Sequence, residues 1–143
     1  MSATNKLFFV DTNVLVYAYD LSAGLKHRKA ADLLTGLWKE RTGCLSIQVL
    51  QEFFVTITRK AAHPLPVDKA AQIISDLATW RVHQPGIPDV LMAIEISRRN
   101  LISFWDALII ESAVKLKCDV VFSEDLNPGQ TYEGVKIVNP FAT

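Results

Sequence analysis

Two aspartates follow short apolar runs of the kind that form buried parallel strands. Asp11 comes directly after Leu7–Val10, and Asp125 lies just past Val120–Ser123. Parallel strands in an open α/β sheet end at a shared edge, where ligands bind, so we expect the two carboxylates to lie close together. Each aspartate also has a simpler interpretation, because Asp11 can cap the following helix and Asp125 can stabilise a turn in its loop.

Two further acids belong to predicted helices. Asp106 completes Ser103-Phe104-Trp105-Asp106 ahead of an apolar stretch, which is the spacing of a capping box. The dipole of a first helical turn favours a negative charge there under either interpretation. Glu52 lies at the flank of the apolar face of the helix that follows Ser46. On periodicity alone, Glu52 is a solvated helix glutamate.

Four carboxylates gathered in one place require compensation of their charge. Two like charges about 4 Å apart repel by roughly 4 kcal/mol at an effective dielectric constant of about 20, so such a cluster needs bound cations or raised pKa values. Oxygen ligands suit Mg²⁺ or Mn²⁺ rather than zinc. No zinc-ligand spacing connects the histidines and cysteines of the chain, which are His27, His63, His83, Cys44 and Cys118.

Strand and helix patterns alternate along the chain. The predicted strands are Leu7–Val10, Cys44–Ile47, Val120–Ser123 and Val135–Val138. The predicted helices are a stretch starting near Asn13 and the ranges 26–40, 47–60, 67–80, 88–98 and 105–117. This alternation predicts a three-layer α/β/α fold with a central parallel sheet. The length of 143 residues predicts a single domain, residues 1–143.

Composition narrows the classes of protein. The chain has 15 basic and 15 acidic residues, and this neutrality weakens a pure nucleic-acid-binding module more than an enzyme built on carboxylates. No apolar run approaches the roughly 18 residues of a membrane span, and Met1–Lys6 lacks the apolar core of a signal peptide. We therefore expect a cytoplasmic protein in which Cys44 and Cys118 are reduced and buried.

Four segments combine these features into one pattern: a strand followed by Asp-x-Asn, a helical glutamate, Trp-Asp opening a buried helix, and a strand followed by Ser-x-Asp. They are Val10–Ala18, Gln51–Phe53, Phe104–Ile109 and Phe122–Leu126, and a C-terminal strand and tail, Tyr132–Phe141, follows them. In order and spacing, this pattern resembles the PIN-domain nucleases, and among them the VapC-type toxins of bacterial toxin–antitoxin pairs. The resemblance covers essentially the whole chain, from Leu7 to Phe141.

The resemblance implies a metal-dependent endoribonuclease that uses Mg²⁺ or Mn²⁺. Its catalytic acids would be Asp11, Glu52, Asp106 and Asp125, the three aspartates would ligate the metal, and Asn13 and Ser123 would orient the acids. It also implies a toxin role, a VapB-type antitoxin as partner and a homodimer, with no membrane association. No histidine pair indicates cleavage through the 2′-OH, so we expect a metal-bound water to attack phosphorus and to leave 5′-phosphate and 3′-OH ends.

Contacts with RNA would come from residues outside the acids. Basic candidates, each of which also fits a solvated helix face, are Lys26, Arg28, Lys29, Arg59, Lys60, Arg98 and Arg99. The three tryptophans, Trp38, Trp80 and Trp105, are expected to pack in the core rather than to stack on bases.

Three other functions remain open on the residues. A receiver-like regulatory domain would need an acidic pair after its first strand, where this chain has the single Asp11. A phosphatase with Asp11 as nucleophile would need a second aspartate that Asp11-Thr12-Asn13 lacks. The third is a catalytically silent PIN-like module that only binds RNA.

Overall fold

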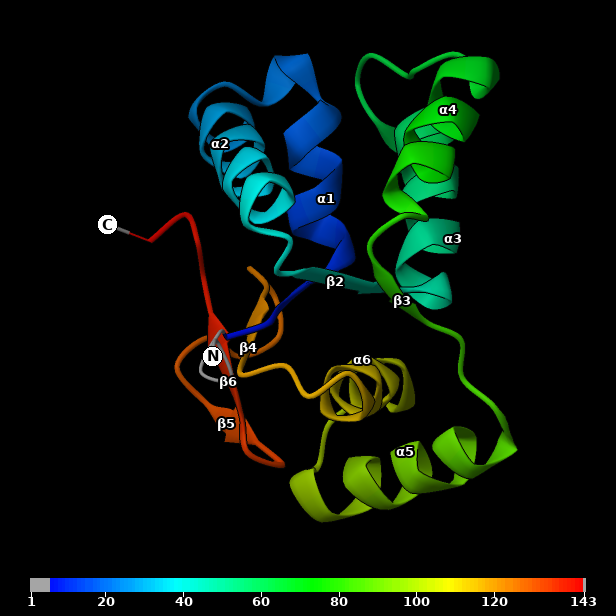
Figure 1. Ribbon diagram of the computed structural model, residues 1–143, viewed down its shortest axis with the longest axis vertical. Helices are drawn as coiled ribbons and strands as arrows, with labels where there is room; N and C mark the ends of the chain where they lie inside the picture. The colour runs from blue at the N-terminus through cyan, green and yellow to red at the C-terminus, as the bar shows by residue number, and fades with distance from the viewer. Residues whose placement is uncertain (1–5, 143) are drawn as a thin grey trace.

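A six-stranded sheet forms the middle of the molecule (Figure 1). The computed structural model describes residues 6–142. The strand order is β3-β2-β1-β4-β6-β5, and every neighbouring pair is parallel except β5 with β6. The strands are β1 (Phe8–Val10), β2 (Gly43–Ser46), β3 (Arg81–His83), β4 (Val120–Phe122), β5 (Thr131–Tyr132) and β6 (Val135–Val138).

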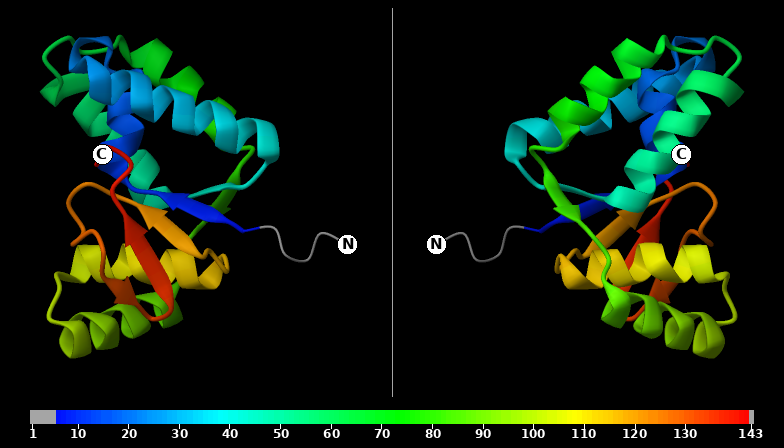
Figure 2. Two further views of the ribbon diagram at one scale, coloured as in Figure 1. Left: turned by 90° about the vertical axis from the view of Figure 1, so that its left-hand side faces the viewer. Right: turned by 90° about the vertical axis from the view of Figure 1, so that its right-hand side faces the viewer.

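Helices cover both faces of this sheet, which confirms the predicted three-layer α/β/α fold (Figures 1 and 2). One layer contains α1 (Thr12–Tyr19), α2 (Leu25–Glu40), α3 (Ile47–Val55) and α4 (Val67–Leu77). The other contains α5 (Ile87–Asn100) and α6 (Phe104–Lys115). A short 3-10 turn, η1 (Leu21–Ala23), and a π-helical turn, η2 (Thr56–Lys60), complete the helical segments.

The core lies on both faces of the central strands. Phe9 of β1, Val121 of β4 and Ile137 of β6 are fully buried, as the apolar runs of these strands predict for a sheet covered on both sides. Helix α6 is buried along seven consecutive residues, Ala107–Ala113. Each large apolar side chain buried in this way contributes on the order of 2 kcal/mol, so the strand ends beside it are held firmly in place.

The structure differs from the sequence prediction at several boundaries. The helix predicted over residues 47–60 is regular only to Val55, after which the chain forms the π-helical turn. The helix predicted to Trp80 ends at Leu77, and Arg81–His83 is a strand that the sequence did not indicate, as is Thr131–Tyr132. The sheet is therefore mixed at the β5 edge rather than wholly parallel.

Three remaining expectations concern cysteines, membranes and the N-terminus. Cys44 and Cys118 are both free and buried, as predicted. Within residues 6–142, no helix has the length and apolar character needed to cross a bilayer. Of Met1–Lys6, only Lys6 lies within the described residues.

Candidate active site

Asp11 joins the end of β1 to the start of α1. It is the N-cap of α1, and its Oδ1 accepts a hydrogen bond from the Thr12 backbone N–H at 2.8 Å. Its Oδ2 accepts a second bond, from the Ser123 hydroxyl, also at 2.8 Å. The helix-cap interpretation of Asp11 is therefore correct, but it does not exclude a role in a site, because the other carboxylate oxygen faces the loop after β4.

Asn13 connects this turn to the same loop. Its Oδ1 accepts from the Glu124 backbone N–H at 3.1 Å. Its Nδ2 lies 3.5 Å from Asp11 Oδ2 and 3.4 Å from Asp125 Oδ2, which are long hydrogen bonds. Asn13 thus brings together two aspartates that are more than a hundred residues apart in sequence.

Ser123 shapes the loop that carries Asp125. The Ser123 hydroxyl oxygen accepts from the backbone N–H groups of Asp125 at 3.3 Å and of Leu126 at 3.1 Å. The turn is therefore made by the serine, and the Asp125 side chain remains exposed. The predicted supporting positions, Asn13 and Ser123, contact the acids directly.

Glu52 leans from α3 toward the first turn of α1. Its Oε1 accepts from the Thr12 hydroxyl at 2.7 Å, and its Oε2 lies 3.4 Å from Gln48 Nε2. Glu52 is exposed, as helical periodicity predicted. Its hydrogen bond to Thr12 nevertheless fixes it beside Asp11.

Asp106 enters from the opposite helical layer. Ser103 is the N-cap of α6, and its hydroxyl accepts from the Asp106 backbone N–H at 3.0 Å, as the predicted cap requires. The neighbouring Trp105 is 61% exposed, so the expectation that it packs in the core is wrong. Its backbone carbonyl lies 3.4 Å from Gln48 Nε2, which links the start of α6 to α3.

The charges of the four acids act on one another. Burial raises the pKa of Asp11 to about 6, and the charges of Asp106 and Glu52 raise it further, against the hydrogen bonds from Ser123 and Thr12 that lower it. Burial also raises the pKa of Asp106, and Glu52 and Asp125 add to this shift while Ser103 opposes it. Each predicted acid is therefore within electrostatic reach of at least one other.

The donor atoms at this edge match a hard cation, since all of them are carboxylate, amide or hydroxyl oxygens. Burial, with a smaller contribution from mutual repulsion, raises the pKa values of Asp11 and Asp106, and a bound cation would relieve that repulsion. Within the described chain, no three His, Cys, Asp or Glu side chains are yet arranged to hold one ion. Glu52 and Asp125 are both exposed, so their carboxylates can be reached from solvent.

A second network beside the acids was not indicated by the sequence. The Lys26 ammonium contacts the Glu124 carboxylate, and the Tyr17 hydroxyl donates to the same carboxylate at 3.1 Å. Lys26 Nζ also lies 5.1 Å from the centroid of the Tyr17 ring. Lys26, predicted as a contact for RNA, is thus occupied in holding the loop next to Asp125. Long-range pairs of this kind leave no local sequence signal.

Other predicted RNA contacts are also engaged within the protein. Arg99 pairs with Glu133 at 2.6 Å, and Arg98 pairs with Glu95 on the surface of α5. Lys29 Nζ lies 3.4 Å from the Phe141 carbonyl oxygen. For these three residues the solvated-face or structural interpretation accounts for the contacts observed.

Between α5, α6 and β3, a separate pair of acids is buried. Asp89 accepts from the Gly86 backbone N–H at 2.8 Å, and its Oδ2 lies 3.4 Å from His83 Nε2. Burial raises the pKa of Glu111 to about 7, and the neighbouring Asp89 raises it as well. Ser112, whose hydroxyl lies 2.7 Å from His83 Nδ1, is fully buried. This serine, histidine and aspartate therefore form a packing network, closed to substrate.

Fold and site together define an α/β/α domain that collects acidic side chains at the carboxyl edge of its sheet. The PIN-domain family matches residues 8–133, and the chain belongs to that family. The resemblance found in the sequence is thereby confirmed at the level of the family. A search of curated protein sequences finds no match.

Solved structures share this fold at low sequence identity. The toxin VapC20 of Mycobacterium tuberculosis, which cleaves the sarcin–ricin loop, is 20% identical with a TM-score of 0.61, over 84% of this chain and 91% of that chain. A toxin–antitoxin complex from Klebsiella pneumoniae is 17% identical with a TM-score of 0.69, over 96% and 100%. VapBC2 of Rickettsia felis, bound to a promoter DNA fragment, is 14% identical with a TM-score of 0.63, over 92% and 96%.

Proposed function

We propose that this protein is a metal-dependent endoribonuclease and the toxin of a toxin–antitoxin pair. The observation that carries the proposal is the group of acids at one sheet edge, where Asn13 lies between Asp11 and Asp125 and Glu52 accepts from Thr12. Membership of the PIN-domain family supports nuclease chemistry. The toxins among the proteins of similar fold support the biological role.

The proposal assigns a task to each side chain. Asp11, Asp106 and Asp125 hold one or more Mg²⁺ or Mn²⁺ ions, and Glu52 completes the acidic wall. Such an ion, when bound, lowers the pKa of a water molecule and stabilises charge on the phosphate. Asn13 and Ser123 keep the Asp11 carboxylate oriented through the hydrogen bonds described above. An asparagine at position 11 would still accept from the Thr12 backbone N–H through its single carbonyl oxygen, but it would lose the ligand charge.

Cleavage of RNA in defined metal conditions tests the enzymatic part. Purified protein should cut transfer or ribosomal RNA in Mg²⁺ or Mn²⁺ and lose this activity in excess EDTA. Asp106→Asn should abolish cleavage, whereas Asp68→Asn should not, although Asp68 also occupies the first turn of a helix. Full cleavage in EDTA would contradict the metal-dependent mechanism. RNA binding without cleavage in either metal would favour the catalytically silent module.

The same proposal includes a homodimer and a cytoplasmic complex with a VapB-type antitoxin. It is supported by the VapBC complex and the toxin–antitoxin complex among the proteins of similar fold. Coexpression with the product of an adjacent small gene should yield a complex that suppresses cleavage, and light scattering should give twice the monomer mass at micromolar concentration. Monomers throughout that range would contradict the dimer, and failure to copurify would contradict the antitoxin.

A further inference from the structure

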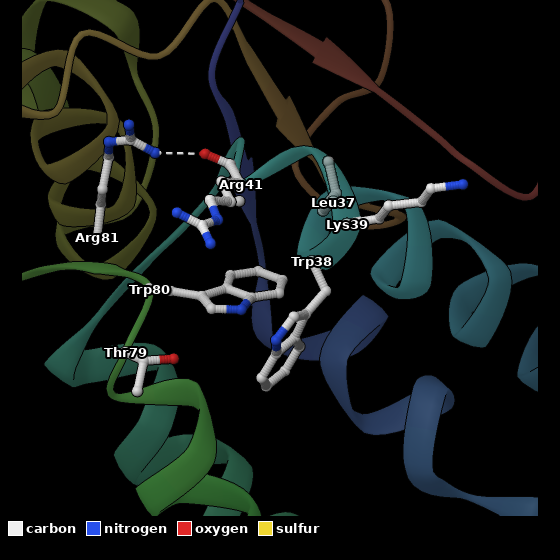
Figure 3. Close-up of a pocket in the computed structure, with 8 residues that line it drawn as sticks. Leu37, Trp38, Lys39, Arg41, Thr79, Trp80 and Arg81 are labelled. Carbon is white, nitrogen blue, oxygen red and sulfur yellow. Dashed lines mark hydrogen bonds between the residues drawn. The ribbon is translucent and has the colours of Figure 1, made fainter.

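A cavity of about 710 Å³ lies at the opposite, amino edge of the sheet (Figure 3). Its lining comes from the last turn of α2, the segment after α4 and the first residues of β2 and β3. This volume falls within the range of about 300–1,000 Å³ that is typical of small-ligand pockets. None of the candidate catalytic acids lines the cavity.

Two indole rings form one wall of this cavity. Trp38 and Trp80 meet edge to face, with ring centroids 5.3 Å apart and an interplanar angle of 70°. Trp80 is fixed against the backbone of β2, because a Cβ atom at Gly43 would lie 2.3 Å from its ring. Trp38 is 40% exposed, so the expectation that this tryptophan packs in the core is also wrong. The result is a preorganised aromatic surface that remains partly open to solvent.

Cationic side chains surround the indoles. Lys39, Arg41 and Arg81 line the cavity, and no acidic residue among the described residues 6–142 does so. The Arg81 guanidinium donates to the Arg41 backbone carbonyl at 2.6 Å, and Figure 3 shows both arginines on the same side of Trp80. Lys39 and Arg41 lie at the carboxyl end of α2, where the helix dipole favours positive charge. The lining of the cavity therefore combines flat aromatic surface with three cationic side chains.

We propose that this cavity binds a nucleotide, with its base against the indoles and its phosphate among the three cations. Stacking on an aromatic side chain together with a cationic groove is how proteins grip unpaired nucleotides. An acidic peptide would satisfy the cations but would leave the indole surface unused. The occupant is an unpaired nucleotide of the RNA substrate, held at the sheet edge opposite the acids. This last assignment rests on the proposed ribonuclease function.

Binding can be measured without cleavage, so the two proposals are separable. The probe is a fluorescein-labelled, single-stranded RNA of six adenosine nucleotides. Its binding is measured by fluorescence anisotropy in excess EDTA. AMP should displace it, and adenosine, which lacks the phosphate, should displace it more weakly. Displacement by an acidic peptide but not by AMP would overturn the nucleotide assignment. Binding of AMP without binding of the RNA would retain the nucleotide and overturn its RNA source.

Variants locate the binding in this cavity. Trp38→Ala should weaken RNA binding by about tenfold, as expected when one stacked base is lost. Lys39→Gln should weaken it and reduce the slope of log K against log salt by about 0.7. The matched control is Lys69→Gln on the exposed surface of α4, which should bind like the parent. Parent-like binding by both Trp38→Ala and Lys39→Gln would overturn the proposal, and the lysine variant serves as the test if Trp38→Ala fails to fold.

Discussion

The two edges of one sheet carry opposite charge. At the carboxyl edge, α1 and α6 begin, and Asp11 and Asp106 lie at their first turns. At the amino edge, α2 ends, and Lys39 and Arg41 lie at its last turn. Helix dipoles favour this distribution, with acids at N-termini and bases at C-termini. A parallel sheet flanked by helices therefore separates an acidic surface suited to cations from a basic surface suited to phosphates.

The dipole does not explain everything at the acidic edge. Helix N-termini favour carboxylates in their charged form, yet the pKa of Asp11 is raised to about 6 and that of Asp106 is raised too. Burial and mutual repulsion thus outweigh the dipole at this edge. On the basic edge, the cationic lining lacks such opposition, because its neighbours are aromatic rings. The acidic edge therefore holds its carboxylates against a free-energy cost of charging them, and no such cost is evident at the basic edge.

The largest effect should come from removing charge at the acidic edge. Asp11→Asn should reduce RNA cleavage by more than about 100-fold, since substitutions that merely support metal ligands already cost roughly 10–100-fold. The same variant should be more stable than the parent without metal at pH 7.5, by about 1–3 kcal/mol. Single-turnover cleavage and urea unfolding measure the two effects.

The sign of the stability change follows from the raised pKa of Asp11. A folded pKa of about 6 against 3.8 means that the penalty for charging Asp11 grows as pH rises from about 4 to 6. The advantage of Asp11→Asn should therefore vanish near pH 4. A variant that is less stable at pH 7.5 and cleaves at the parent rate would reduce Asp11 to a helix cap.

The sequence predicted the acidic edge better than the basic edge, for a physical reason. Asp11 follows one apolar strand directly and Asp125 lies shortly after another, so local pattern and topology together place them. The cavity at the other edge depends on Trp38 meeting Trp80 across the fold, and on β3, whose exposed Arg81 breaks the apolar pattern of a strand. Contacts between residues far apart in the sequence form only on folding, so the hydrophobic periodicity of the sequence does not predict them.

The same contrast holds within the candidate site. The Ser103 cap ahead of Asp106 was predictable from four consecutive residues. The bond from Thr12 to Glu52 spans forty residues, and it changes a solvated glutamate into a neighbour of Asp11. The Lys26–Glu124 pair spans 98 residues and turns a predicted RNA contact into support for a loop.

The buried pair Asp89 and Glu111 shows a second way in which this protein accommodates neighbouring carboxylates. Glu111 is buried, so a hydrated cation cannot reach its carboxylate. We expect a proton to neutralise the carboxylate instead. Its folded pKa is about 7 against 4.5, so stability is fully present below pH 4.5 and is lost as pH rises through 7. Glu111→Gln should therefore be more stable than the parent at pH 8, by about 1–3 kcal/mol, and equal to it near pH 4.5.

Urea unfolding at several pH values tests the Glu111 prediction. The charged groups that act on Glu111 or on its partner Asp89 include His83, Lys115 and Glu133, and all of them are retained in the variant. Glu40→Gln, at an exposed position at the end of α2, is the matched control and should show no such pH dependence. A constant difference between Glu111→Gln and the parent from pH 4.5 to 8 would contradict the proton-based explanation.

Substitution of Trp105 tests whether an aromatic side chain also binds RNA at the acidic edge. Trp105 is 61% exposed and precedes Asp106, so the proposed function would place its indole within reach of an RNA base. Trp105→Ala should raise KM for RNA about tenfold, the cost of one lost stacking contact, and leave kcat nearly unchanged. Trp105→Phe should recover most of the affinity. A fall in kcat at constant KM would instead indicate that Trp105 positions Asp106.

The smallest effect is expected at Arg41. Its substitution by glycine distinguishes the effect of backbone strain on stability from the effect of charge on RNA binding at the basic edge. Arg41 ends α2 in the left-handed conformation, with φ of 58°, where glycine is favoured because it lacks a Cβ atom. Arg41→Gly should therefore raise the free energy of unfolding, by at most about 1 kcal/mol. It should also weaken binding of the RNA hexanucleotide, because one of three cations at the cavity is lost.

Leu101 supplies the control for this separation. It ends α5 in the same left-handed conformation, with φ of 55°, and its side chain is 92% exposed. Leu101→Gly should give a similar gain in stability with no change in RNA affinity, since it lies outside the cavity. If both glycine variants bind RNA like the parent, Arg41 only closes a helix. If Arg41→Gly alone loses affinity while both gain stability, a strained residue is retained at this edge for its charge.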